Sequence, residues 1–336
     1  MKVTMAHGSG GESTSGLIKN VFAKYFNNDI LNRLEDSAVV PGNSRLAMTT
    51  DSFVVTPIEF PGGNIGRLSV CGTVNDLLMS GSKPMYITCG FILEEGLDLD
   101  ILERQVKALS ECAKEAGVTI VTGDTKVIEN RGGEPGLIIN TSGVGFISDG
   151  SEAIGPSNLK DGDVIILSGN LGDHHAAILS KRMGIENNIQ SDAAPLTEAV
   201  GNLMAQKIRV HAMRDVTRGG LGTVLNEFAE SSDCEIDLYE EKLPVSSEVR
   251  DFCGLLGLDP IYMGNEGKFV LSVHADDAEK ALSIIRGSKY CENAVVIGEV
   301  KKNNRAVDMH RVILNTAIGG KRVVGLMYGE GLPRIC

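Results

Sequence analysis

The chain has 336 residues, 42% of them hydrophobic and 23% charged, a composition that is ordinary for a folded protein and excludes a disordered chain. Its formal net charge of −12 argues against non-specific binding to nucleic acid or to an anionic membrane surface. No apolar run reaches the ~18 residues of a membrane span, and the start MKVTMAHGSGGES lacks the apolar segment of a signal peptide. We therefore expect a cytoplasmic protein of about two domains, at roughly 150 residues each.

The first half of the chain mixes predicted strands with predicted helices. Apolar patterning predicts strands over 45–51, 84–93, 118–124 and 137–147. Apolar residues at steps of three and four predict an amphipathic helix over 64–80. The same spacing, stopped by Gly117, predicts a helix over 98–116.

A polar stretch that contains glycine and proline, residues 148–163, is predicted to separate an N-terminal domain (1–150) from a C-terminal α/β domain (151–324). The second domain is expected to alternate strands and helices, with strands over 164–167, 268–273 and 295–300 and helices over 219–231 and 276–286. Residues 325–336 have little apolar periodicity, so we expect a mobile C-terminal tail.

The tail ends in one of seven cysteines, Cys336. The cysteines form no CxxC pair, and in an acidic cytoplasmic protein they are expected to stay reduced, most of them as small core residues. Cys336 differs because a terminal thiol has almost no steric protection and invites oxidation. An extended tail from Gly325 spans at most ~37 Å, enough to carry this thiol to a distant cleft.

Five aspartates lie at turn-like positions flanked by glycine or threonine: Asp36, Asp51, Asp76, Asp124 and Asp215. Two of them, Asp51 and Asp124, each end a predicted apolar strand, where sheets often bind ligands. Carboxylates that converge on one cleft would suit Mg²⁺ carrying nucleotide phosphates, since this ion takes oxygen ligands. Each aspartate taken alone is better explained as a turn former or helix cap.

Other candidate residues allow two interpretations each. The glycine-rich stretches 7–11 and 219–222 could present N–H groups to phosphate or be plain turns, and the Walker A and dinucleotide-binding patterns are absent. Glu266 could act as a base, with Lys126 or Lys268 as a charge stabiliser in a phosphate cleft, or these residues could be isolated, solvated charges. His174 and His175 begin a predicted helix and point about a hundred degrees apart, which favours a surface or capping role over a shared metal.

Motifs along nearly the whole chain carry a family resemblance. They are HGSGGE (7–12), EDSAVV (35–40), TTDSFVV (49–55), FPGGNIGRLSVCGTVNDLLMSG (60–81), VTGDTKV (121–127), LSGNLGDH (167–174), MRDVTRGGL (213–221), GNEGKF (264–269) and the terminal PRIC (333–336). Together they resemble the HypE family of hydrogenase-maturation carbamoyl dehydratases, in the superfamily of aminoimidazole ribonucleotide synthetase and selenophosphate synthetase. PRIC at the extreme C-terminus selects this branch. His175 departs from the family, where a glycine follows GDH.

The resemblance implies an α+β chain with a two-domain aminoimidazole ribonucleotide synthetase-like fold, whose N-terminal domains form a shared β-barrel in a homodimer, with ATP near the interface. It implies the following residue roles: Mg²⁺ at Asp36, Asp76 and Asp215, and ATP contacts from Asp51, Asp76, Gly123, Asp124 and Thr125. It also implies that HypF carbamoylates Cys336 and that ATP-dependent dehydration yields a thiocyanate. The cyano group then passes to iron on the HypC–HypD complex, for a nickel–iron hydrogenase.

Elementary chemistry is consistent with that reaction. An amide oxygen is a poor leaving group, so phosphorylation by ATP must precede elimination to a nitrile, and one base must remove the N–H protons. Our candidate base is Glu266, with Lys126 neutralising charge on the phosphate. Two rival hypotheses are an ATP-dependent synthetase that acts on a free small molecule and a non-enzymatic metallochaperone or maturation scaffold.

Overall fold

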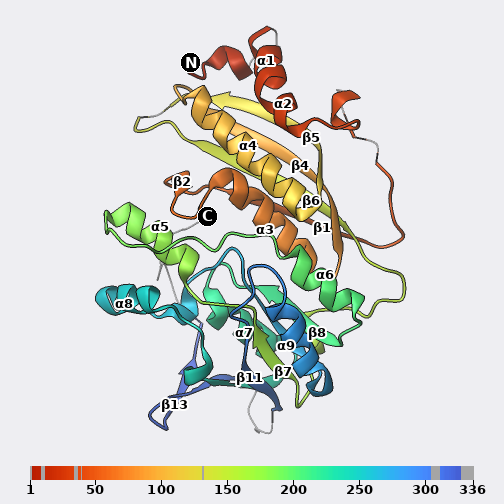
Figure 1. Cartoon of the computed structure of the whole chain (residues 1–336), viewed down its shortest axis with the longest axis vertical. Helices are drawn as coiled ribbons and strands as arrows, with labels where there is room; N and C mark the ends of the chain where they lie inside the picture. Colours follow the sequence, from red (N-terminus) through yellow and green to blue (C-terminus); the bar gives the residue numbers. More distant parts are fainter. Residues whose placement is uncertain are drawn as a thin grey trace.

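The computed structural model describes residues 2–8, 12–33, 37–38, 40–130, 132–303 and 311–326. The strands among these residues form a four-stranded sheet, a seven-stranded sheet and a two-stranded hairpin. In Figure 1 the four-stranded sheet and its helices occupy the upper half, and the seven-stranded sheet lies in the lower half. The chain therefore has the α+β character that the sequence predicts.

The four-stranded sheet has the order β1 (Leu46–Phe53), β6 (Leu137–Phe146), β4 (Lys83–Glu94) and β5 (Thr119–Ile128). Two helices cover one face of it, α3 (Ile65–Met79) and α4 (Leu99–Ala116) (Figure 1). The smaller elements of this half are α1 (Glu12–Leu17), a π-helical turn (Ile18–Phe22), α2 (Ala23–Phe26), 3-10 turns at Met5–Gly8 and Leu31–Arg33, and the hairpin β2 (Glu59–Phe60) and β3 (Gly63–Asn64). Since β4 and β5 are parallel and the other pairs antiparallel, the sheet is mixed.

Helix α3 begins and lies where its sequence predicts, but it is not amphipathic. The Asn64 side chain caps its first turn by accepting a hydrogen bond from the N–H of Arg67, at 2.9 Å. Its buried residues include Ser69 and Thr73 as well as the predicted apolar stripe. The expectation of one polar face was wrong because α3 lies between the four-stranded sheet and the C-terminal half, which leaves no face for solvent.

The contact between α3 and α4 depends on Gly66. A Cβ at Gly66 would lie 2.1 Å from the main-chain oxygen of Gln105 on α4. We expect Gly66→Ala to force the helices apart and to lower the free energy of unfolding by about 1–3 kcal/mol. As a control, Gly201 lies in a helix with no atom within 4 Å of its Cβ position, so Gly201→Ala should raise stability by about 0.5–1 kcal/mol. Urea denaturation of both variants measures the difference, and equal stabilities would contradict the steric argument.

The seven-stranded sheet has the order β13–β12–β9–β11–β7–β10–β8. Its strands are β7 (Val164–Leu167), β8 (Val210–Asp215), β9 (Cys234–Tyr239), β10 (Phe269–Val273), β11 (Val295–Lys302), β12 (Arg311–Asn315) and β13 (Lys321–Val324). The helices of this half are α5 (Asp173–Met183), α6 (Thr197–Ala205), α7 (Gly220–Ser231), α8 (Ser247–Leu256) and α9 (Ala278–Arg286), with 3-10 turns at Pro156–Asn158, Glu240–Lys242, Pro260–Tyr262 and Ala275–Asp277.

Alternating residues of the central strand β7 face two different cores. Ile165 and Leu167 belong to the cluster built with α7, whereas Ile166 belongs to the cluster that contains residues of α3, α6 and α9. Since every residue of this short strand after Val164 is buried, β7 has the continuous apolar pattern that the sequence predicts for it.

The predicted elements agree with the structure in type, and several strands are longer than expected. β1 continues to Phe53 and β5 to Ile128, so Asp51 and Asp124 lie inside strands instead of ending them. Both strands continue through consecutive polar residues, which the apolar pattern did not mark as strand. The cysteines of the described residues are all buried and free, as expected. None of the helices in the described ranges is long and apolar enough to cross a membrane.

Candidate active site

Four acidic side chains converge where the two halves of the molecule meet. Asp51 comes from β1, Asp76 from α3, Asp215 from the end of β8 and Glu266 from the loop before β10. Their charges act on one another: besides burial, which is the largest cause, Asp51 raises the pKa of Asp76, and Asp76 raises that of Asp215. The negative charges of the three aspartates likewise raise the pKa of Glu266. The structure thus brings together residues that are separated by up to 215 positions in the sequence.

Local structure directs these side chains toward one another. On β1, Asp51 and Phe53 lie on the side that faces α3, because alternate residues share one face of a strand. A Cβ at Gly72 of α3 would lie 3.3 Å from a carboxylate oxygen of Asp51 and 2.8 Å from the Phe53 ring, so this glycine makes room for both. Thr49, two residues before Asp51 on the same face, donates a hydrogen bond to Asp76 at 2.8 Å.

Burial raises the pKa of every acid in this cluster, and repulsion by neighbouring carboxylates adds to this effect for Asp76, Asp215 and Glu266. Burial first, and then the charge of Asp76, raise the pKa of Asp215 to about 7. Burial is likewise the largest cause for Asp51 and Asp76, while Arg218 acts in the opposite direction on both. Carboxylates that repel one another are stabilised by a bound cation. The cluster is therefore suited to bind positive charge.

The donor set fits Mg²⁺ held partly by phosphate. No group of three or more His, Cys, Asp and Glu side chains within the described ranges is arranged to hold a metal ion. Asp76 and Asp215 nevertheless supply two carboxylates, and Mg²⁺ is usually held by one or two carboxylates together with phosphate oxygens and waters. The third predicted ligand, Asp36, lies outside the described residues.

Glu266 and Lys268 are not the solvated charges that the alternative interpretation predicts. They are 4% and 7% exposed, respectively. Within the described part of the chain neither carboxylate oxygen of Glu266 has a hydrogen-bond partner, and burial together with the nearby acids holds its pKa well above the usual range. A buried carboxyl with a raised pKa is the kind of group that accepts a proton near neutral pH. This environment agrees with the role of a base.

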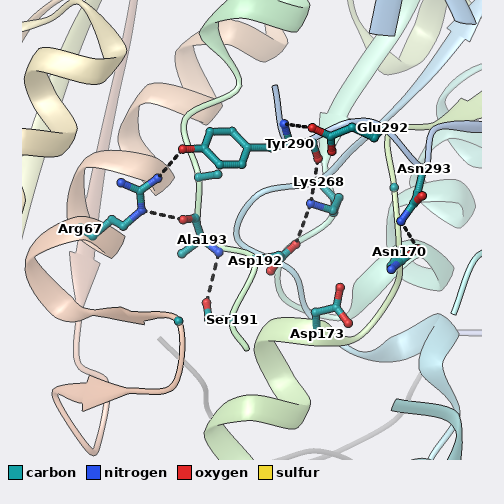
Figure 2. Close-up of a pocket in the computed structure, with 13 residues that line it drawn as sticks. Arg67, Asn170, Asp173, Ser191, Asp192, Ala193, Lys268, Tyr290, Glu292 and Asn293 are labelled. Atoms are coloured by element: carbon teal, nitrogen blue, oxygen red, sulfur yellow. Dashed lines mark hydrogen bonds and ion pairs between the residues drawn. The ribbon is translucent and has the colours of Figure 1, made fainter. Parts of the chain in front are cut away.

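Lys268 lines a cavity of about 460 Å³ whose lining does not include Glu266 (Figure 2). Its Nζ donates to the main-chain oxygens of Gly267 (3.0 Å) and Tyr290 (3.3 Å) and lies 3.6 Å from a carboxylate oxygen of Asp192. The same cavity is lined by Asp173, whose pKa is raised to about 6 by burial and by Asp192. Since its ammonium group is satisfied in this way, Lys268 stabilises the loop that carries Glu266.

The predicted residues of β5 are not brought to the cluster within one chain. The sheet register sets Asp124 opposite Gly90, Gly90 opposite Asn140, and Asn140 opposite Ser52, the neighbour of Asp51. Three strand spacings of ~4.8 Å therefore separate the two edges of the sheet, about 14 Å in all. The other predicted residues of this edge are Gly123, Thr125 and Lys126.

Lys126 is exposed and forms an ion pair with Asp124, at 2.8 Å. The interpretation as a solvated surface charge therefore fits Lys126 but not Glu266. Lys126 is not isolated, however, because it is paired with Asp124. The stretch 219–222 contributes to packing at the start of α7, where a Cβ at Gly220 would lie 2.5 Å from the carbonyl carbon of Tyr262. Most of the stretch 7–11, as well as Cys336, lies outside the described residues.

The expectation that His174 and His175 lie at the surface was wrong. Both are buried, at 0% and 3% exposure. His174 makes a hydrogen bond of 2.7 Å with Ser191 and packs edge-on against Phe60. Burial lowers the pKa of His175 to about 4, so this ring is neutral near pH 7. The pair faces the interior because α5 packs against both β2 and α8.

Sequence reasoning missed Thr49, Asn75 and Asp192. The first could have been predicted, since Thr49 shares a strand face with Asp51. Asn75 precedes Asp76 on a helix and Asp192 lies in an irregular segment, so no periodicity marks either residue. Both hold main-chain groups of the Glu266 loop, and only the folded chain brings them there.

Two family descriptions match the chain. The N-terminal domain of the AIR synthase related proteins matches residues 34–147, and the C-terminal domain matches residues 160–310. Carbamoyl dehydratase HypE of Rhodobacter capsulatus is 44% identical over 342 residues, which cover 100% of this chain and 98% of that protein. The two family matches cover the four-stranded sheet and the seven-stranded sheet as far as β11.

Solved structures agree. The hydrogenase maturation protein HypE in complex with ATP aligns with a TM-score of 0.93 at 44% identity, over 99% of each chain. HypE in the HypE–HypF complex aligns with a TM-score of 0.79 at 43% identity, over 93% of this chain and 99% of that one. The fold is thus that of an AIR synthase related protein. The chain belongs to the HypE family of carbamoyl dehydratases, which are enzymes.

Proposed function

We propose that the protein uses ATP to dehydrate an S-carbamoyl group on Cys336 to a thiocyanate, which supplies the cyanide ligand of iron in nickel–iron hydrogenase assembly. The convergence of Asp51, Asp76, Asp215 and Glu266 in one buried cluster carries this proposal. A metal-bound triphosphate needs carboxylates, and elimination needs a base. The cluster offers both, and the similar HypE structure was solved with ATP.

In this mechanism the carbamoyl oxygen attacks the γ-phosphorus of ATP and ADP leaves. The O-phosphorylated group first loses one N–H proton to give a neutral imidate. Glu266 then takes the second N–H proton as the C–O bond to phosphate breaks, which releases inorganic phosphate and leaves the nitrile carbon on sulfur. Asp76 and Asp215 would hold Mg²⁺, with Asp36 as the predicted third ligand. When bound, the ion would neutralise the negative charge of the phosphates. Asp51 lies beside Asp76, where it can orient the nucleotide.

A second copy of the chain would complete the site. Both edges of the four-stranded sheet, β1 and β5, have no further strand beside them within the described ranges. Two such sheets can close into one eight-stranded barrel, which removes both edges. In this homodimer Gly123, Asp124, Thr125 and Lys126 of one subunit would approach the nucleotide of the other. Lys126 would then neutralise charge on the transferred phosphate.

The division of labour along the chain follows from this proposal. Residues 1–150 form the domain for ATP binding and dimerisation, residues 151–324 form the α/β domain that supplies Asp215 and Glu266, and residues 325–336 carry Cys336. HypF, which is found with HypE in the similar complex structure, is the proposed carbamoyl donor. The HypC–HypD complex is the proposed acceptor of the cyano group, in the cytoplasm.

Intact-mass spectrometry tests the reaction directly. The protein is loaded with HypF, carbamoyl phosphate and ATP, free nucleotide and magnesium are removed, and ATP and magnesium are then added back separately and together. We expect a gain of one carbamoyl group on the C-terminal peptide, followed by the loss of one water only when ATP and magnesium are present. Water loss without ATP would contradict the proposal.

Asp76→Asn is expected to weaken Mg·ATP binding at least about tenfold and to leave the fold in place. Asp76 is half-buried, and its loss removes one carboxylate from a divalent-ion site, which costs more than a surface ion pair. Asparagine keeps the shape and can still accept the hydrogen bond from Thr49. Isothermal titration with ATP and magnesium measures the affinity. The matched control is Asp251→Asn on exposed α8, and equal affinities for the two variants would exclude Asp76 from the site.

A further inference from the structure

Asn75 is a buried polar residue of α3, 2% exposed, next to Asp76 in the sequence. Its side chain leaves its own helix and contacts two segments of the C-terminal half. The Nδ2 group donates to the main-chain oxygens of Ala194 at 3.0 Å and of Glu266 at 3.3 Å. Its Oδ1 accepts a hydrogen bond from the N–H of Leu196 at 3.0 Å.

The orientation of the Asn75 amide follows from its partners. Two carbonyl oxygens require donors and one N–H requires an acceptor, so only the orientation with Nδ2 toward Ala194 and Glu266 satisfies all three groups. The side chain therefore bridges α3 and the C-terminal half through contacts that a shorter or apolar residue cannot make. Displacing the Asn75 side chain would leave these buried main-chain groups without hydrogen-bond partners, which costs free energy. The hydrogen bonds therefore resist movement of α3 relative to the C-terminal half.

The main chain of Glu266 is held on both sides. Its N–H donates to Oδ1 of Asp192 at 3.1 Å, and its C=O accepts from Asn75 and, at 3.4 Å, from the N–H of Ala194. The carboxylate of Glu266 has no hydrogen-bond partner among the described residues. The direction of this carboxylate is consequently set by its backbone.

We propose that Asn75 is a positioning residue that fixes the base Glu266 relative to the nucleotide acids of α3, an inference that rests on the proposed function. Asp76 and Asn75 are consecutive on one rigid helix, so the carboxamide that holds the Glu266 peptide moves together with a ligand of the metal-bound nucleotide. Proton removal from the amide must coincide with departure of its phosphate. A misplacement of ~1 Å between the two groups is enough to cost about a hundredfold in rate.

Single-turnover dehydration of the carbamoylated protein tests the proposal in a double-mutant cycle. The variants are Asn75→Ala, Glu266→Gln and the double variant, each preloaded by HypF and then given ATP and magnesium. Asn75→Ala should lower the maximal dehydration rate at least about tenfold and leave the half-saturating ATP concentration within about twofold. In the Glu266→Gln background the same substitution should change the residual rate less than about twofold, because the group through which it acts is already lost.

Asn28 supplies a matched control. Its Nδ2 donates to the main-chain oxygens of Phe26 (2.8 Å) and Ile120 (2.9 Å), and its Oδ1 accepts from the N–H groups of Ile30 and Leu31. Asn28→Ala thus removes a similar set of hydrogen bonds far from Glu266. It should leave the dehydration rate unchanged.

The outcomes separate the possibilities. An unchanged rate for Asn75→Ala, a rise in the half-saturating ATP concentration that accounts for the whole loss, or additive losses in the cycle would each overturn the positioning role. If wild-type protein fails to lose water with ATP, the proposed function itself fails, which is a distinct result. Should Asn75→Ala not fold, Asn75→Ser enters the same cycle, since a serine side chain leaves a smaller cavity and is too short to span the three partners.

Discussion

The variant Cys336→Ala is expected to lose all covalent loading while it retains the wild-type melting temperature and ATP affinity. Alanine has no nucleophile for the carbamoyl group. The other cysteines cannot substitute, because all of them are buried, and burial raises the pKa of the thiol to about 12 for Cys234 and to about 11 for Cys253 and Cys291. The reactive form of cysteine is the thiolate, so thiols of this kind are inert near pH 7.

Mass spectrometry of the C-terminal peptide and a thermal melt measure both parts of this prediction. Cys253→Ala is the control: it should load normally and lose about 1 kcal/mol of stability, since Cys253 is 3% exposed and packs in a small cluster with Met263. Full ATP-dependent turnover of a small molecule by Cys336→Ala would favour the synthetase hypothesis. Wild-type protein that binds partners but never couples ATP hydrolysis to modification of its C-terminus would favour the scaffold hypothesis.

Strands and helices with strong periodicity could be predicted from the sequence, as the short strand β7 illustrates. Its apolar run is buried on both faces, and at four residues it is too short to be a helix. The burial of α3 on all sides could not be predicted, because Ser69, Thr73 and Asn75 are polar residues that favour a solvent-exposed position in isolation. Thr73 is satisfied by Thr141 of the four-stranded sheet and Asn75 by the C-terminal half, and nothing local in the sequence encodes these contacts.

Sequence motifs predict the residues of the candidate site, and the structure shows which of them lie together within one chain. Asp51, Asp76, Asp215 and Glu266 come together although no spacing rule connects them, so the family resemblance was required to select them. Lys126 looked equivalent to Glu266 in the sequence, yet it lies at the far edge of the sheet with 64% of its side chain exposed. Strand order decides this difference, and strand order depends on long-range pairing that a local pattern does not determine.

The same geometry predicts opposite effects of Glu266→Gln on activity and on stability. The variant should accept the carbamoyl group normally and then accumulate it, with dehydration slowed about 10²–10⁴-fold, the usual contribution of a general base. Glutamine preserves the size of the side chain but cannot take a proton at neutral pH. Loading is unaffected because it occurs on Cys336. Intact-mass analysis over time should show the carbamoylated protein persisting in the presence of ATP and magnesium.

Without ATP and magnesium, Glu266→Gln should melt at or above the wild-type temperature at pH 8. In the wild type, burial and the charges of Asp215, Asp192, Asp51 and Asp76 hold the pKa of Glu266 well above its usual range. The folded state therefore binds this proton more tightly than the unfolded chain, so wild-type stability falls as the pH rises above the ordinary carboxyl pKa of ~4.3. Glutamine removes this loss, and the advantage of the variant should shrink toward pH 5. A variant that is less stable at pH 8 and still dehydrates its carbamoyl group at the wild-type rate would show that Glu266 is a structural residue and that the base lies elsewhere.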